Sequence, residues 1–296
     1  MNLEGTFTAL ITPFEKNGEI DWRRLEELTR LQIQNDVEGI VPCGTTGESP
    51  TLSHKEHREV IARVIKTAKE EKSEAIVIAG TGSNSTKEAV ELTKAAAEDG
   101  ADYSLSVNPY YNKPTQEGLY RHFSEIADAS SIPIVLYNIP GRTGVSLSID
   151  TIKKLAAHGN IAAIKEATGD LNLMISIIQE TPDNFNLISG DDNLLLPILS
   201  VGGRGVISVV SNIFPKEASE ITRKYLNKEY ETAKEIFMKL FPVCGAMFLE
   251  TNPIPVKYAA SYLNLCENVL RLPLTPVSKE NEIKIQNAVN AFKGAA

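Results

Sequence analysis

Residues 132–138 read IPIVLYN, and similar apolar runs stand at 76–80 (IVIAG) and 205–210 (GVISVV). Continuous runs rich in Val, Ile and Leu are typical of parallel strands that are covered on both faces. Charged segments with apolar residues at helical spacing lie between most of these runs, for example at 87–99. Eight strands are predicted in all: Thr6–Ile11, Gly39–Cys43, Ala75–Ala79, Tyr103–Val107, Pro133–Asn138, Ile161–Lys165, Asn186–Ser189 and Gly205–Val209.

Strands that alternate with helices predict an α/β fold, and eight such units predict a (β/α)8 TIM barrel. A doubly wound open sheet is the alternative, but it requires a glycine turn for phosphate after the first strand. The first strand here leads into Thr12-Pro13-Phe14 instead. Strand signals stop after Asn212, and only helical patterns follow. We therefore expect a catalytic barrel over 1–224 and a C-terminal helical domain over 225–296. The helices expected after the last strand are Lys216–Leu226, Glu229–Phe248, Val256–Leu263 and Ser278–Phe292.

Composition excludes several classes of protein. The net charge is −8 and no basic stripe is present, so nucleic acid is not an expected partner. We find no signal peptide and no apolar run that would span a membrane, so we expect a cytoplasmic protein. The three cysteines fit neither a disulfide framework nor a zinc site, which predicts buried, reduced thiols. His54 and His57 stand three apart without further ligands nearby, so no metal site is expected.

Lys165 ends the sixth predicted strand, and barrel enzymes carry their active sites at the C-terminal strand ends. Alternation along the strand would place Ile161, Ala163 and Lys165 on one face. Burial favours the neutral form of a lysine, and a neutral amine is the nucleophile that forms a Schiff base. The alternative is that Lys165 lies just past the strand and pairs with Glu166 or another acid.

Polar residues follow two other predicted strands. Tyr137 would point into the same mouth as Lys165, where its hydroxyl could move protons, although a packed rim tyrosine fits the pattern as well. Residues 44–48 (GTTGE) could offer hydroxyl and N–H donors to a carboxylate, or form a simple turn. Arg142, in the loop after the fifth strand, could clamp a second carboxylate or remain a solvated arginine.

Seven motifs together resemble the pyruvate-dependent class I aldolases, and within them the dihydrodipicolinate synthase family. The resemblance runs in order along essentially the whole chain. The motifs are GTTGE (44–48), NPYYN (108–112), YNIPGRTG (137–144), IKEATGD (164–170), SGDD (189–192), GVISV (205–209) and NPIPVK (252–257).

This resemblance implies condensation of pyruvate with L-aspartate 4-semialdehyde, through a lysine Schiff base, to give 4-hydroxy-tetrahydrodipicolinate. That reaction is the first committed step of lysine biosynthesis via diaminopimelate. Lys165 then corresponds to the Schiff-base lysine. The proton relay would comprise Tyr137, Thr45 and Tyr111, the last of them reaching in from a neighbouring subunit.

The resemblance also implies the remaining substrate contacts and the assembly. Thr46 would bind the pyruvate carboxylate, Arg142 would hold the semialdehyde carboxylate, and Gly190 and Ile207 would line the pyruvate pocket. The family implies a homotetramer built from two tight dimers, with no metal or organic cofactor.

Feedback inhibition by L-lysine is a further implication of the resemblance. In lysine-sensitive members the inhibitor binds in a cleft between the subunits of the tight dimer. Pro50 departs from the small residue expected in that loop. The matching positions in this sequence are Ser49, His54, His57, Asn84, Glu88 and Tyr110.

Two alternatives concern the reaction itself. An N-acetylneuraminate lyase or a 2-keto-3-deoxy sugar-acid aldolase would keep Lys165 and Tyr137 but would typically lack Arg142. A catalytically silent regulatory barrel would be expected to lose the lysine or the tyrosine, and both are present here.

Overall fold

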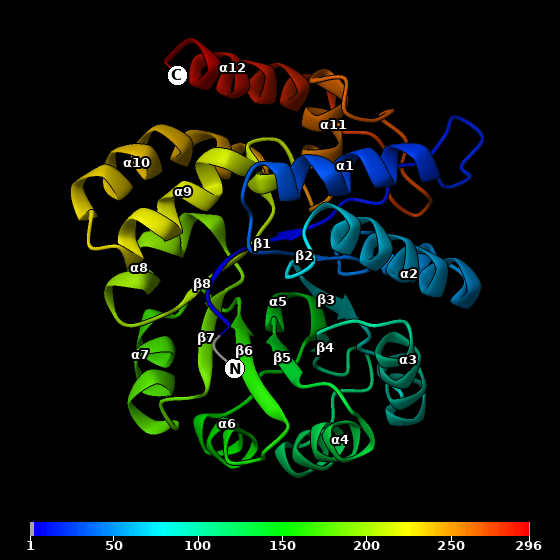
Figure 1. Ribbon diagram of the computed structural model, residues 1–296, viewed down its shortest axis with the longest axis vertical. Helices are drawn as coiled ribbons and strands as arrows, with labels where there is room; N and C mark the ends of the chain where they lie inside the picture. The colour runs from blue at the N-terminus through cyan, green and yellow to red at the C-terminus, as the bar shows by residue number, and fades with distance from the viewer. Residues whose placement is uncertain (1–2, 296) are drawn as a thin grey trace.

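A computed structural model describes residues 3–295, and eight parallel strands in it form a closed barrel in chain order (Figure 1). This confirms the predicted fold class, and every predicted strand matches to within two residues at each end. Residues 1, 2 and 296, at the outer ends of the two predicted domains, lie outside the described residues. The strands are β1 (Gly5–Ala9), β2 (Gly39–Val41), β3 (Ile76–Gly80), β4 (Tyr103–Val107), β5 (Ile134–Asn138), β6 (Ile161–Glu166), β7 (Asn186–Ser189) and β8 (Gly205–Ser208).

Helices form a ring outside the strands (Figure 1). Several begin at a Ser, Thr or Asp whose side chain accepts from the first turn, for example Ser53 before α2 and Asp170 before α7. The helices of the barrel are α1 (Trp22–Gln34), α2 (His54–Glu71), α3 (Thr86–Glu98), α4 (Gln116–Ala129), α5 (Pro140–Thr143), α6 (Ile149–Ala156), α7 (Leu171–Glu180), α8 (Leu195–Ser200) and α9 (Pro215–Leu226), with short 3-10 turns η1 (Ser49–Thr51), η2 (Asp192–Leu194) and η3 (Val210–Asn212).

Three helices follow the barrel and gather on one side of it, next to α1 and α9 (Figure 1). They are α10 (Tyr230–Ala246), α11 (Ile254–Tyr262) and α12 (Lys279–Ala295), close to the predicted segments. One apolar cluster contains Leu25 of α1, Ile221 of α9 and Leu240 of α10. Apolar packing is therefore continuous between the barrel and the helices that follow it. The predicted domain boundary between residues 224 and 225, which lies within α9, stays a prediction. No helix within residues 3–295 is both long and apolar enough to cross a membrane.

The prediction that Ile161 shares a face with Ala163 and Lys165 is wrong. The register between β5 and β6 shifts, because Ile134 pairs with Ile161 whereas the next residue, Val135, pairs with Ala163. A β-bulge therefore interrupts the alternation at the start of β6. Ile161 packs with Ile134 on the helix side, and Ala163 packs inside the barrel.

Two glycines close the barrel where β1 meets β8. Gly5 pairs with Gly205, and a Cβ added at Gly205 would lie 1.8 Å from the carbonyl oxygen of Gly5. Asn212 of η3 ties the same seam together: its Oδ1 accepts from the N–H of Ile11 at 3.0 Å and its Nδ2 donates to the carbonyl of Ala9 at 2.8 Å. The last strand thus fits against the first only because Gly205 carries no side chain, whereas a Cβ at Gly5 would meet the Glu38 side chain.

Candidate active site

Lys165 lies within β6 and is 6% exposed. It pairs in register with Tyr137 of β5, and its Nζ lies 4.1 Å from the centre of the Tyr137 ring. Within residues 3–295, Lys165 makes no ion pair, so the alternative pairing with Glu166 is wrong. The structure therefore places an unpaired amine against an aromatic ring near the C-terminal end of the barrel.

Glu166 belongs instead to a buried polar network on the other face of β6. Its Oε2 accepts from Asn138 Nδ2 at 2.8 Å, and its Oε1 accepts from the N–H of Thr168 at 2.7 Å. Asn108 at the end of β4 in turn donates to Asn138 Oδ1 at 2.9 Å. Burial raises the pKa of the Glu166 carboxyl, and the hydrogen bonds from Asn138 and Thr168 oppose that rise. The network fixes the ends of β4, β5 and β6 relative to one another.

Gly190, one of the two residues predicted to line a pocket around the lysine, lies close to it. A Cβ added at Gly190 would be 2.6 Å from the Ala167 Cβ and 3.2 Å from the Lys165 Cε. Only glycine lets the chain pass this close to the lysine stem. Ile207 is fully buried and shares the interior apolar cluster with Tyr137.

Thr46 and Arg142 are joined by Asn252, a residue without a predicted role. Asn252 Nδ2 donates to Thr46 Oγ1 at 2.9 Å, and one Arg142 NH2 group donates to the Asn252 carbonyl oxygen at 2.9 Å. Arg142 stands on α5, a single helical turn, rather than in a loop. Asn252 lies in the quoted NPIPVK motif, but its contacts with residues more than 100 positions away left no local signal.

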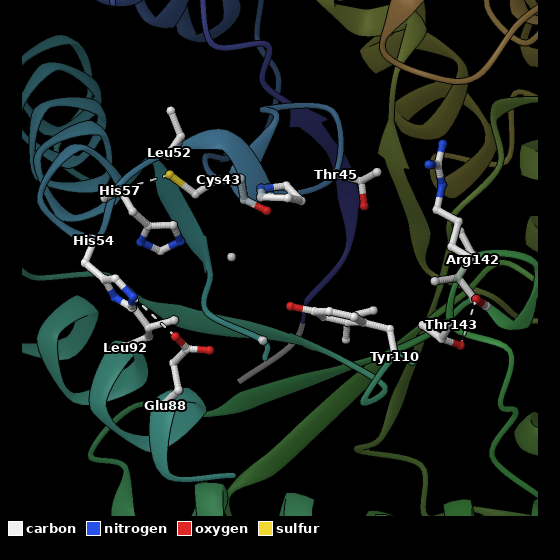
Figure 2. Close-up of a pocket in the computed structure, with 16 residues that line it drawn as sticks. Cys43, Thr45, Leu52, His54, His57, Glu88, Leu92, Tyr110, Arg142 and Thr143 are labelled. Atoms are coloured by element: carbon white, nitrogen blue, oxygen red, sulfur yellow. Dashed lines mark hydrogen bonds and ion pairs between the residues drawn. The ribbon is translucent and has the colours of Figure 1, made fainter. Parts of the chain in front are cut away.

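A cavity of about 420 Å³ opens beside these residues (Figure 2). Thr45 and Arg142 lie at one end of it, and His54, His57 and Glu88 lie at the other, with Tyr110 between them (Figure 2). Ser49 and Pro50 also line it, whereas Lys165 and Tyr137 are not part of its lining. The cavity therefore connects Thr45 and Arg142 with residues of the predicted lysine site, and Lys165 lies outside it.

Polar contacts organise the far end of this cavity. Glu88 Oε1 lies 3.3 Å from His54 Nε2, and its other oxygen accepts from the Ser83 hydroxyl. Burial lowers the pKa of His57, which favours its neutral form. Asn84 does not line the cavity, but its amide donates to the carbonyl of Tyr110 at 3.2 Å.

Tyr111 does not line the cavity. Its backbone has a φ of 72°, in the left-handed region, and its side chain is 90% exposed. The third predicted relay residue is thus largely exposed to solvent in the single chain.

The remaining predicted features concern metals and thiols. No group of three or more His, Cys, Asp or Glu side chains within residues 3–295 is arranged to hold a metal ion. Cys43, Cys244 and Cys266 are buried and free, as predicted.

Comparison with known proteins gives consistent matches along the chain. A model of the dihydrodipicolinate synthetase family matches residues 2–292. The 4-hydroxy-tetrahydrodipicolinate synthase of Leptospira biflexa serovar Patoc (strain Patoc 1 / Ames) is 56% identical over 276 residues, which cover 93% of this chain and 92% of the relative.

Solved structures agree with this match. The chloride-inhibited dihydrodipicolinate synthase from Acinetobacter baumannii, complexed with pyruvate, is 43% identical with a TM-score of 0.95, covering 99% of both chains. The enzyme from Cyanidioschyzon merolae with lysine bound is 40% identical with a TM-score of 0.94, covering 98% of both chains. A monomeric dihydrodipicolinate synthase variant is 41% identical with a TM-score of 0.95, covering 98% of this chain and 97% of the other.

Proposed function

Because the chain belongs to the dihydrodipicolinate synthetase family, we propose that Lys165 carries its reaction as a covalent imine with pyruvate. The chain is an enzyme of this family: it condenses pyruvate with L-aspartate 4-semialdehyde to give 4-hydroxy-tetrahydrodipicolinate, the first committed step of lysine biosynthesis via diaminopimelate. The observation that carries the proposed role of Lys165 is its position: buried, without an ion pair, and 4.1 Å from the Tyr137 ring.

The proposed reaction begins with imine formation on Lys165 and ends with release of the free lysine. The Lys165 amine adds to C2 of pyruvate and the carbonyl oxygen leaves as water, which gives a protonated imine. Loss of a proton from C3 produces an enamine, and C3 then attacks the aldehyde carbon of the semialdehyde. The resulting alkoxide takes up a proton. The amine of the semialdehyde finally displaces Lys165, closes the ring and frees the enzyme.

Three kinds of residue assist these steps in our proposal. Tyr137, Thr45 and Tyr111 relay the protons, Thr46 binds the pyruvate carboxylate, and Arg142 binds the carboxylate of the semialdehyde. The guanidinium of Arg142 is anchored through one nitrogen to Asn252, which leaves donors for a substrate carboxylate. Gly190 and Ile207 complete the pyruvate pocket beside the lysine.

The exposed Tyr111 supports an oligomeric enzyme. A tyrosine that is 90% exposed on a left-handed backbone is well placed to enter the site of a second copy. We propose a homotetramer of two tight dimers, in which each tight dimer exchanges Tyr111 between its sites. The proposed enzyme works in the cytoplasm and uses no cofactor, since the imine itself stabilises the developing charge on pyruvate.

L-Lysine is the proposed inhibitor at the far end of the cavity. Glu88 suits the ammonium group, and the Tyr110 hydroxyl and the Asn84 amide suit the carboxylate. Ser49, His54 and His57 complete the site. The lysine-bound relative supports this ligand, and the cavity beside Thr45 supports communication with the active site.

Borohydride trapping tests the central proposal. Incubation with pyruvate and borohydride should attach one pyruvate remnant to Lys165, as read by peptide mass spectrometry. Lys165→Arg should lose both the adduct and nearly all turnover while keeping the wild-type circular dichroism spectrum. An adduct on a different lysine, in the wild type or in the variant, would contradict the assignment.

A further inference from the structure

Lys257 and Glu48 form an ion pair that is fully buried, with both side chains 0% exposed. Lys257 Nζ lies 2.5 Å from Glu48 Oε1, donates to the Val269 carbonyl at 2.7 Å, and sits 3.9 Å from the centre of the Phe14 ring. The pair joins α11, from the helical region after the barrel, to the loop that follows β2. It belongs to neither the lysine–tyrosine pair nor the cavity lining.

Glu48 terminates the loop that carries Thr45 and Thr46. Its N–H donates to the Thr45 carbonyl at 3.1 Å, and its backbone adopts a left-handed φ of 53°. The N–H of Arg271 donates to the other carboxylate oxygen, Oε2, at 3.1 Å. Both oxygens of Glu48 are therefore held by residues from the region after the barrel.

The same region holds the loop at a second point, through Asn252. Its amide donates to Thr46 Oγ1 at 2.9 Å, and its carbonyl accepts from Arg142 at 2.9 Å. We call residues 252–257 (NPIPVK) the brace, since its first and last residues contact the two segments that carry the proposed carboxylate ligands.

Stability alone does not explain a charge pair in this position. Two buried charges lose their hydration, and an apolar pair of similar size is often as stable or more stable. What the ion pair supplies is a fixed position, because an ammonium and a carboxylate at 2.5 Å tolerate little displacement. That requirement fits a loop whose hydroxyl must meet a substrate carboxylate.

We propose that Lys257 and Asn252 are positioning residues for pyruvate binding, which they serve by fixing the loop of Thr45 and Thr46 through the brace. This inference rests on the proposed function, in which Thr46 binds the pyruvate carboxylate. It predicts that disturbing the brace weakens pyruvate binding and leaves Lys165 able to form its imine once pyruvate is saturating.

The test replaces the ion pair by an apolar pair, in the double variant Glu48→Leu/Lys257→Met. The double variant should remain folded, with a pyruvate KM raised about tenfold, which corresponds to about 1.4 kcal/mol. At saturating pyruvate, borohydride should still trap the adduct on Lys165. Val289→Ala, a buried apolar truncation in α12, is the control: it should lower the Tm without changing KM.

A second variant tests the proposal independently if the double variant does not fold. Asn252→Leu removes the donor to Thr46 and keeps the backbone carbonyl that holds Arg142, so it should raise the pyruvate KM more than the semialdehyde KM. A pyruvate KM equal to that of the wild type, in either folded variant, would overturn the proposed role of the brace. Absence of a trapped adduct in the wild type itself would instead refute the proposed function.

Discussion

The Arg142 guanidinium donates to the Asn252 carbonyl, and the residue remains exposed beside the cavity. Arg142→Ala should therefore raise the barrier for reaction with the semialdehyde by about 1.5–3 kcal/mol, the range for hydrogen bonds to charged groups, while imine formation changes little. Steady-state kinetics with each substrate varied, together with borohydride trapping, would measure both effects. Arg121→Ala, which removes an exposed pair with Glu117 on α4, is the control and should leave both unchanged. Equal loss of imine formation and condensation would contradict the assignment.

A residue's place in the site could be predicted from the sequence when the residue lies at a strand end. It could not be predicted when it depends on contacts with residues far away in the sequence. Lys165 and Tyr137 lie at the ends of neighbouring strands, so the strand pattern alone brings them together. Asn252 contacts Thr46 across 206 positions, and nothing in either local sequence encodes that contact.

The start of α2 is tied to the region after the barrel by Arg271. Glu56 belongs to the capping box of α2 and accepts from the Arg271 guanidinium, with its nearest oxygen at 2.6 Å. This hydrogen bond is the main cause that lowers the pKa of Glu56 from 4.5 to about 2. A carboxyl whose pKa is depressed on folding stabilises the protein above its unfolded pKa and loses that contribution as the pH falls.

Glu56→Gln should therefore lower the free energy of unfolding at pH 7 by about 1 kcal/mol, a value reduced for the partial exposure of the pair. The difference from wild type should shrink as the pH falls from 4.5 towards 2, where the wild-type carboxylate also becomes protonated. Urea unfolding at pH 7 and pH 3 measures this. Glu59→Gln on the same helix removes an exposed pair with Arg63 and should change little at either pH. A constant difference at both pH values would exclude this role for Glu56.

The strands could be predicted from apolar runs in the sequence, but the β-bulge at the start of β6 could not. Residues 161–164 read Ile-Ala-Ala-Ile, and small alanines fit either the barrel interior or the helix side. Only pairing with β5, where Ile134 and Val135 are fixed by their own packing, decides which way Ile161 points.

The cavity beside Thr45 holds the site that we propose for inhibition by L-lysine. L-Lysine at millimolar concentration should inhibit the wild type, and Glu88→Ala should weaken that inhibition by about tenfold or more, since it removes a charged partner of the ammonium. Initial rates over a lysine series measure the effect. Glu91→Ala, an exposed residue on the same helix, should behave as wild type. Inhibition that is absent in the wild type, or unchanged by Glu88→Ala, would reject this site.

The strand pattern predicted the fold of the monomer, whereas only the family resemblance implied an assembly, which stays a prediction. Tyr111 and Tyr110 are adjacent in sequence, yet Tyr110 lines the cavity and Tyr111 is 90% exposed and does not line it. The left-handed φ of Tyr111 separates their directions, and no propensity of tyrosine predicts that conformation.

The pairing of β1 with β8 at Gly5 and Gly205 also determines when the barrel can close during synthesis. The first strand leaves the ribosome early, but its partner around Gly205 is made roughly 200 residues later, which at 5–20 residues per second means a delay of about 10–40 s. For that interval β1 can pair only with β2, and its other edge stays open to the wrong strand. The unpaired edge of β1 consequently stays accessible to chaperones and to wrong pairing until β8 and Asn212 emerge and close it.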